Sequence, residues 1–378
     1  MALILTEEQA MLQDSAKGFL AESGVAELRR VRDTRDADGF SRDLWKAFAE
    51  MGFTGILAPE AHGGLGLGHV EAGVVMEEIG RNLTPSPFLS TAVLGVRAID
   101  RGAGEERKAD LLPRIVAGDL ITALAVDEGA KHRPQAIALK AERSGNGFRL
   151  SGAKGFVVDG HVADLLIVAA RTAGSPGEEA GLTLFVVDPK ASGVSIERTV
   201  MVDAHNAARI RFDGVEVDAD AVLGEVDGGW ALLEGVLNTG RAAVASELLG
   251  VGAESFDRTV AYLGERRQFG KAIGEFQALQ HRAAHLYSEL QVTRAAVLKA
   301  LQMMDEAPDA ALPFVSVAKA RAGRTATLAV QEAVQMHGGI GMTDEVDIGL
   351  FMKRARVAQE LFGDDNFHAD RIARMGSY

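Results

Sequence analysis

The segment "LFGDDNFHADR" (361–371) has side chains suited to proton transfer, with three carboxylates, a histidine and an arginine in eleven residues. Such a density is expected where a protein moves protons or holds a metal ion. Asp364 and Asp365 are equally good residues for capping a helix that begins near Asn366. The segment alone leaves open whether it is a catalytic loop or only the start of a helix.

The composition limits the chemistry available to the chain. It has 378 residues and no cysteine, which excludes disulfides, thiolate metal sites and a cysteine nucleophile. Redox chemistry would therefore need a cofactor. A formal charge of −13 and the lack of a basic tract argue against nucleic acid as a partner.

The location expected from the sequence is the cytoplasm. The N-terminal "MALILTEEQAMLQ" lacks the basic region of a secretory signal. No run of ~20 apolar residues, the length a spanning helix needs, occurs in the chain. We expect a globular protein without a membrane segment.

The hydrophobic pattern predicts three successive segments. Residues 1–119 have helical periodicity, 120–226 contain short β-rich runs separated by turns, and 227–378 return to long helical repeats. The predicted fold is therefore a multidomain α+β protein. It should comprise an N-terminal helical domain, a middle antiparallel β-barrel or sandwich, and a C-terminal four-helix bundle.

Two features of the N-terminal segment define its helices more closely. Thr6 and Gln9 have the spacing of a capping box. The stretch "RDLWKAFAEMG" predicts a helix that ends at Gly52. Its predicted buried face consists of Leu44, Ala47, Phe48 and Met51.

We predict no metal site. His281 and His285 have the i, i+4 spacing that can hold zinc on a helix, but no HExxH pattern accompanies them. A partly exposed or hydrogen-bonded pair is the favoured interpretation.

The most specific sequences are "YLGERRQFGKAIGEFQALQHRAAHL" (262–286) and "QEAVQMHGGIGMTDEVDIGLFMKRAR" (331–356). They resemble the flavin-dependent acyl-CoA dehydrogenases, and "AKGFVVDGHVAD" resembles that family's middle-domain flavin strand. The order of helical, β and helical segments is also that of the family. The resemblance covers essentially the whole chain and implies an oxidoreductase of lipid metabolism with FAD as cofactor.

Two groups of residues are predicted to bind the adenosine end of FAD. Arg266 and Gln268 supply donors for a pyrophosphate, and Phe269 supplies apolar surface. In the family the first motif reaches into the flavin site of a neighbouring subunit, which implies an oligomer, with a tetramer expected. The resemblance assigns the same end of the cofactor to Gln335, Gly338 and Gly339, where backbone without a Cβ can approach closely.

In the middle domain, the resemblance places the flavin ring against two short strands. Val126 and Asp127 lie where the family has a T-E-P-like sequence. Phe156 replaces the family's tryptophan, and Val158 replaces a threonine that would bond the flavin near N5. An aromatic wall is retained, and backbone N–H groups would have to replace the missing hydroxyl.

The carboxylate base of the family is missing from both of its usual positions. Dehydrogenation needs a base for the α-proton and an acceptor for the β-hydride. The common position falls here at Phe362 or Gly363, and the less common one at Gly240, before Arg241. The remaining catalytic candidates are Asp364, Asp365 and Glu247. Three roles are open for the two aspartates: a substitute base, a contact to flavin hydroxyls or a helix cap. Two roles are open for Glu247: a base, or a residue of the bundle that is paired with another charge.

The C-terminal sequence also resembles the small subunits of two-component dehydrogenases linked to pimeloyl-CoA and steroid-CoA esters. In such assemblies a homologous large subunit can supply the base. The predicted function is an acyl-CoA dehydrogenase subunit that forms a trans-2-enoyl thioester and passes electrons to an electron-transfer flavoprotein. The alternatives are a non-catalytic subunit completing a partner's flavin site, and an acyl-CoA oxidase.

Overall fold

The computed structural model describes residues 3–376, and the chain forms two compact units. Of the described residues, the first unit, called here the helical unit, contains 3–30, 69–84 and 241–376, and the second contains 31–68 and 85–240. The predicted order of helices, then strands, then helices is confirmed. The domain boundaries at 119/120 and 226/227 remain predictions, because the chain passes between the two units more than once.

The N-terminal third is helical, as predicted. The capping box is formed, since Thr6 N donates to Gln9 Oε1 at 3.0 Å and Gln9 N donates to Thr6 Oγ1 at 3.2 Å. The helices are α1 (Glu7–Thr34), α2 (Arg42–Glu50), α3 (His69–Asn82), α4 (Val96–Gly102) and α5 (Glu105–Val116), with short 3₁₀ turns at Phe53–Gly55 and Glu60–His62 and a π-helical segment at Phe88–Gly95.

One predicted face in this region was partly wrong, since Phe48 is buried as expected and Met51 is not. In α2 the buried residues are Trp45 and Phe48, whereas Met51 is exposed. Trp45 is held inside because its indole Nε1 donates to the Gly118 carbonyl at 3.1 Å. Met51 lies just past the last helical residue, and Gly52 follows with a φ of 77°, so the helix ends where the sequence predicted.

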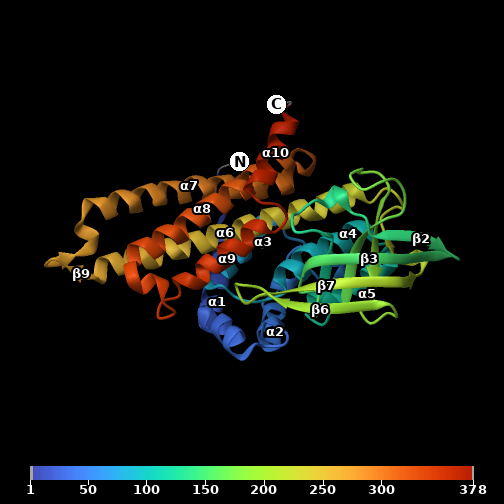
Figure 1. Cartoon of the computed structure of the whole chain (residues 1–378), viewed down its shortest axis with the longest axis horizontal. Coiled ribbons are helices and arrows are strands. Elements are labelled where there is room, and N and C mark those ends of the chain that lie inside the picture. The colour runs from blue at the N-terminus through green and yellow to red at the C-terminus, as the bar shows by residue number, and fades with distance from the viewer. Residues whose placement is uncertain (1–2, 377–378) are drawn as a thin grey trace. The chain divides into compact units, whose positions relative to one another are not determined.

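The second unit contains an eight-stranded sheet (Figure 1). Its strand order is β6-β7-β3-β2-β4-β5-β8, with β1 paired to β4, and its apolar residues form one buried cluster. The strands are β1 (Thr122–Ala125), β2 (Lys140–Ser144), β3 (Gly147–Val158), β4 (Leu165–Arg171), β5 (Leu182–Val187), β6 (Val194–Val200), β7 (Asn206–Val217) and β8 (Val222–Leu223).

The sheet is mixed and open where an antiparallel barrel or sandwich was predicted. Its outermost strands, β6 and β8, do not pair with each other in the described chain. Strand β1 pairs with β4 in parallel. Because β1 and β4 run in the same direction, the chain must return from the end of β1 to the start of β4. The β2–β3 hairpin lies in this crossover connection.

The C-terminal helices are α6 (Trp230–Glu265), α7 (Gln277–Glu306), α8 (Leu312–His337), α9 (Ile348–Glu360) and α10 (Asp365–Met375). Three long helices, α6, α7 and α8, and the two shorter helices α9 and α10 thus follow the sheet in sequence. In the helical unit α3 packs tightly on α6, because a Cβ added at Gly80 would overlap the Glu247 carbonyl and one at Gly250 the Glu77 carbonyl. Within residues 3–376, no helix has the length and apolar character needed to cross a membrane.

Candidate functional site

A β-hairpin projects from one end of the bundle and carries the first predicted FAD motif. It consists of β9 (Arg267–Gln268) and β10 (Lys271–Ala272), and Figure 1 shows it beyond the ends of α6 and α7. Its tip residue Phe269 has a φ of 53° and is 90% exposed. An apolar ring so fully exposed is unusual and is typical of a surface that contacts a ligand or another chain.

The predicted phosphate donors on this hairpin are available for binding. Arg266 and Gln268 are exposed, and within residues 3–376 neither side chain forms a hydrogen bond or ion pair. Below them, the hairpin is fixed by a small apolar cluster that joins its base to the end of α8. That cluster consists of Tyr262, Leu263, Ile273, Phe276, Leu279 and Met336.

The second predicted motif lies at the same end of the bundle. Helix α8 ends at His337, whose ring stacks on Tyr262 with centroids 4.4 Å apart. Gly338 has a φ of 65°, and a Cβ added at Gly338 or Gly339 would meet no atom within 4 Å. Gln335 is exposed one turn earlier. The structure therefore brings the residues of the two motifs together, facing open space.

The two middle-domain segments expected to cover the flavin are also adjacent. Gly155 N donates to the Asp127 carbonyl at 2.8 Å, which joins the loop after β1 to β3. Phe156 has a φ of 55° and is 40% exposed, whereas Val126 is buried. Val158 pairs with Ala207 of β7 and is half-buried.

Three polar contacts beside these segments were not predicted from the sequence. Lys154 is buried, and its ammonium donates to the Val126 carbonyl at 2.9 Å and to Glu128 at 2.7 Å. Burial lowers the pKa of Lys154, and the carboxylate of Glu128 opposes that shift. The carboxylate of Asp127 contacts His132 Nδ1 at 2.9 Å. Asp127 and Val126 are thus held in place by side chains that no motif identifies.

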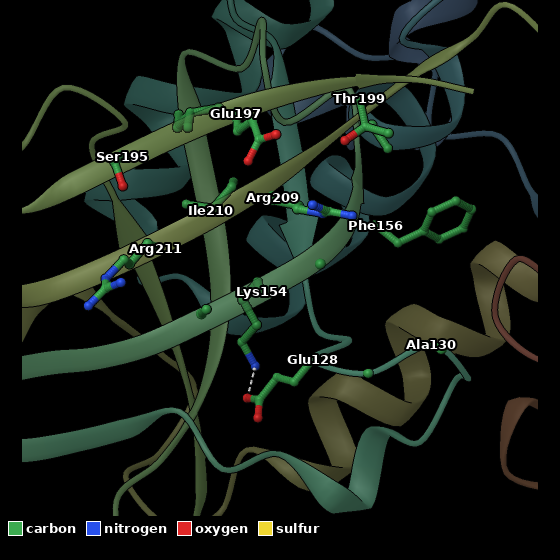
Figure 2. A pocket seen from close by; sticks show the side chains of 15 residues that line it. Glu128, Ala130, Lys154, Phe156, Ser195, Glu197, Thr199, Arg209, Ile210 and Arg211 are labelled. Atoms are coloured by element: carbon green, nitrogen blue, oxygen red, sulfur yellow. Dashed lines mark hydrogen bonds and ion pairs between the residues drawn. The ribbon is translucent and has the colours of Figure 1, made fainter.

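A groove of about 670 Å³ runs along the outer face of β3, β6 and β7 beside Phe156. Figure 2 shows the Lys154–Glu128 ion pair on one side of this groove and Glu197 and Thr199 on the other. Arg209 and Arg211 of β7 line it as well. The groove is large enough for part of an extended ligand and lies next to the predicted flavin wall.

The carboxylates of the opening segment have structural partners. Asp364 is the N-cap of α10, because its side chain accepts from Phe367 N at 2.8 Å. Asp365 pairs with Arg324 at 2.8 Å. Capping, one of the three roles considered for Asp364, is therefore present in the structure.

The preceding turn has an unusual backbone. Phe362 has a φ of 56° and Gly363 a φ of 107°. A Cβ added at Gly363 would overlap the Phe367 ring. A side chain is therefore tolerated at Phe362 and not at Gly363 without movement of the turn.

Glu247, the third catalytic candidate, forms a buried ion pair. Its Oε1 accepts from Arg354 Nε at 2.6 Å, and both side chains are buried. The other oxygen, Oε2, has no hydrogen-bond partner among the described residues. No local pattern could predict this contact, since the two residues are 107 positions apart.

Two further titratable groups inside the helical unit went unnoticed in the sequence. Burial raises the pKa of Glu78 to about 7, and Arg81 opposes that shift. Burial lowers the pKa of Lys319 to about 7. By contrast, His281 and His285 are both exposed on α7. Residues 3–376 contain no cluster of three or more potential metal ligands.

Comparison with known proteins assigns the whole chain to one family. Residues 6–119, 125–215 and 227–376 match the N-terminal, middle and C-terminal domains of acyl-CoA dehydrogenases. The chain belongs to the acyl-CoA dehydrogenase family.

Among its relatives is the cyclohex-1-ene-1-carbonyl-CoA dehydrogenase of Syntrophus aciditrophicus, which is 30% identical over 98% of this chain and 89% of the relative. Two solved structures are also similar. The Tcur3481-Tcur3483 steroid ACAD has 30% identity, 98% coverage of both chains and a TM-score of 0.88. The ChsE4-ChsE5 complex of Mycobacterium tuberculosis has 25% identity, coverage of 100% of this chain and 99% of the other, and a TM-score of 0.88.

Members of this family are oxidoreductases that act on the CH–CH bond of acyl-CoA, and FAD is their cofactor. The predicted residues fit this cofactor. Arg266 and Gln268 have free donors for a pyrophosphate, and the exposed Phe269 offers an apolar face. The space at Gly338 and Gly339 leaves room for ligand atoms against the backbone.

A double-mutant cycle should show that Glu247 and Arg354 form a structural pair. Replacing Arg354 with Met leaves a buried carboxylate unpaired and should lower the free energy of unfolding by ~3–5 kcal/mol. Replacing both residues, Glu247→Met and Arg354→Met, should recover most of that loss. Urea unfolding of the four proteins tests this, and equal losses in the single and double variants would contradict it.

Glu78 should give the stability a distinctive pH dependence. Because its folded pKa is about 7, above its ordinary value of 4.5, the folded state holds this proton more tightly than the unfolded state does. The resulting stabilisation is present below about pH 4.5 and is lost as pH rises through about 7. Unfolding free energies between pH 4.5 and 7 should therefore fall less steeply for Glu78→Gln than for the wild type. The exposed control Glu22→Gln should keep the wild-type slope, and an unchanged slope in Glu78→Gln would refute the assignment.

Proposed function

We propose that this chain is a subunit of an acyl-CoA dehydrogenase that forms a trans-2-enoyl thioester together with a homologous chain. The observation that carries this proposal is a contrast within the helical unit. The cofactor donors Arg266 and Gln268 are free, whereas Asp364, Asp365 and Glu247 already serve a cap or an ion pair. No carboxylate stands at the usual positions of the base, Phe362, Gly363 or Gly240. The partner chain supplies the base in this proposal.

The residues of this chain bind and shield the cofactor. When bound, FAD would supply the acceptor for the β-hydride of the substrate. Arg266 and Gln268 would hold its pyrophosphate by charge-assisted and neutral hydrogen bonds, and Phe269 would offer apolar surface to its adenosine half. Phe156, with Val126, Asp127 and Val158 beside it, would shield the flavin ring from water.

The flavin site is shared between subunits in this proposal. The hairpin extends beyond the bundle helices, and its Phe269 is almost completely exposed, which suits insertion into a neighbouring chain. The Tcur3481-Tcur3483 and ChsE4-ChsE5 structures are each named for two different chains, and both match this chain over nearly its whole length. These matches favour a hetero-oligomer, a tetramer in the simplest case, with a homologous large subunit.

The substrate class follows from the same resemblance. A CoA thioester with a medium-length, dicarboxylic or ring-bearing acyl group is favoured over a short-chain one. Similarity to a cyclohexene-carbonyl-CoA dehydrogenase and to a steroid ACAD supports this choice. Electron-transfer flavoprotein as acceptor and a cytoplasmic location complete the proposal. An oxidase would instead reoxidise its flavin directly with O₂.

Replacing Arg266 with Ala should weaken FAD binding selectively. Loss of a charge-assisted phosphate contact is worth ~1.5–3 kcal/mol, which corresponds to a ~10–100-fold higher Kd for FAD. FAD titration of the complex assembled with a homologous acyl-CoA dehydrogenase chain of the same organism measures this. Arg267→Ala is the matched control, because Arg267 is an exposed arginine next to Arg266, and successive residues of an extended segment project to opposite faces. Full flavin occupancy in Arg266→Ala would refute the contact.

A base introduced at Phe362 should give the isolated chain an activity that it lacks. We expect the wild-type chain without its partner, supplied with FAD so that copies of this chain complete the shared site, to be inactive in α-proton exchange for lack of a base, and Phe362→Glu to catalyse exchange of a bound acyl-CoA in D₂O. The turn accepts a side chain at this position, and Phe362→Gln controls for size without a carboxylate. Exchange by the wild-type chain alone at the rate of the glutamate variant would contradict the proposal.

A further inference from the structure

Two buried cations hold the turn between α9 and α10 by its backbone. Arg241 of α6 is 0% exposed and Lys319 of α8 is 1% exposed. The Arg241 Nε donates to the Phe362 carbonyl at 3.1 Å. The Lys319 ammonium donates to the Gln359 carbonyl at 2.9 Å and to the Gly363 carbonyl at 3.0 Å. Three carbonyls within five residues thus accept from side chains of two other helices.

The turn needs such external support because its own hydrogen bonding is incomplete. Gln359 is in the last turn of α9, where carbonyls have no partner further along the helix. Three residues further on, Phe362 has a left-handed backbone, which costs a non-glycine residue free energy, and Gly363 also has a positive φ. Lys319 bridges the two ends of this segment, since its one amine contacts the carbonyl of Gln359, before the positive-φ residues, and that of Gly363, the second of them.

The burial of Lys319 is not explained by packing alone. An apolar side chain of similar volume would fill the space without the cost of burying an amine. Burial lowers the pKa of Lys319 to about 7 and Arg241 adds to the shift, whereas Glu360, Asp364 and Asp365 oppose it. The amine keeps at least two N–H donors whether it is protonated or neutral, so both carbonyl contacts persist in either state.

We propose that Lys319 is a positioning residue that fixes the backbone of residues 359–363 and, through it, the part of the turn that faces the acyl group. This inference rests on the proposed function, which places Phe362 and Gly363 where the family carries its catalytic carboxylate. In the assembled enzyme, the turn forms a wall of the acyl pocket. A displaced wall misaligns the bound thioester without changing its affinity greatly.

A purely structural role for Lys319 makes a different prediction. If the amine only completes the packing of α8, its removal lowers the stability of the whole helical unit. Amide exchange then rises over all of α8 and α9 alike, and turnover per bound flavin stays at the wild-type value.

The variants that separate these roles are Lys319→Met, Lys319→Gln and Lys353→Met. Methionine matches the length of lysine without N–H donors, whereas glutamine keeps an amide donor. Lys353 of α9 is half-buried, and no side-chain partner for it exists among the described residues, so Lys353→Met is the matched control. Where Lys319→Met does not fold, Lys319→Gln provides the same comparison with a smaller effect.

The first measurement is hydrogen exchange of the full-length chain, followed by mass spectrometry. We expect the amides of residues 359–368 in Lys319→Met to exchange about tenfold faster or more than in the wild type, with a smaller increase in Lys319→Gln and none in Lys353→Met. Exchange that is unchanged in this segment, or that rises equally throughout the bundle, overturns the proposal. Because hydrogen exchange does not require turnover, it tests whether Lys319 fixes the backbone of the turn even if the proposed function is wrong.

The second measurement uses the complex with its partner chain and FAD, assayed with a panel of acyl-CoA thioesters and a dye acceptor. In Lys319→Met, kcat per flavin should fall about tenfold or more while KM and flavin content stay near wild type. Unchanged kcat with faster exchange of the turn overturns the positioning role and leaves the proposed function standing. A wild-type complex without turnover would instead count against the proposed function.

Discussion

Compensation of buried charge is the constraint on which the helical unit depends. Arg241, Lys319 and Arg354 all lie in its interior, and an uncompensated charge there costs several kcal/mol. Carboxylates and backbone carbonyls must therefore be directed at these cations. Glu247 forms an ion pair with Arg354, and the carbonyls of the turn before α10 accept hydrogen bonds from Arg241 and Lys319. This internal compensation gives Glu247 a structural task, while Asp364 caps α10 and Asp365 pairs with Arg324.

At the hairpin end of the same unit, by contrast, two polar side chains lack partners in the described part of the chain. Within the described residues, the side chains of Arg266 and Gln268 form no hydrogen bond or ion pair, and the ring of Phe269 is almost completely exposed. These donors are open for a ligand and for a neighbouring surface, whereas the cations of the interior have partners. The contrast supports a subunit whose cofactor contacts are retained while the proton-accepting group comes from a homologous partner.

Local patterns in the sequence predicted what depends on neighbouring residues. The Thr6–Gln9 capping box and the helix end at Gly52 were both predictable in this way. Contacts between residues that are distant in the sequence could not be predicted from local patterns. Nothing near Glu247 indicates Arg354, and nothing in β3 indicates that Lys154 would turn inward to Glu128. Met51 was misplaced because helical periodicity was extended one residue past the end of α2.

The parallel pairing of β1 with β4 was missed for a related reason, since strand direction depends on the path of the whole connection. The family resemblance added the cofactor and its residues, which physical patterns alone would have left as a capped helix and a turn. It also exposed the absence of a glutamate at Phe362, Gly363 and Gly240, which no single motif reveals.

The most direct test measures α-proton exchange of a bound acyl-CoA, per flavin, in the complex assembled with the homologous chain. The variants are Asp364→Asn, Asp365→Asn and Glu247→Gln, made one at a time in this chain. Asparagine caps a helix as well as aspartate does, so the first substitution preserves the fold. If the partner supplies the base, each variant that retains its flavin should exchange within about threefold of wild type. A loss of ~100-fold in any one of them, with flavin retained, would place the base in this chain and contradict our account.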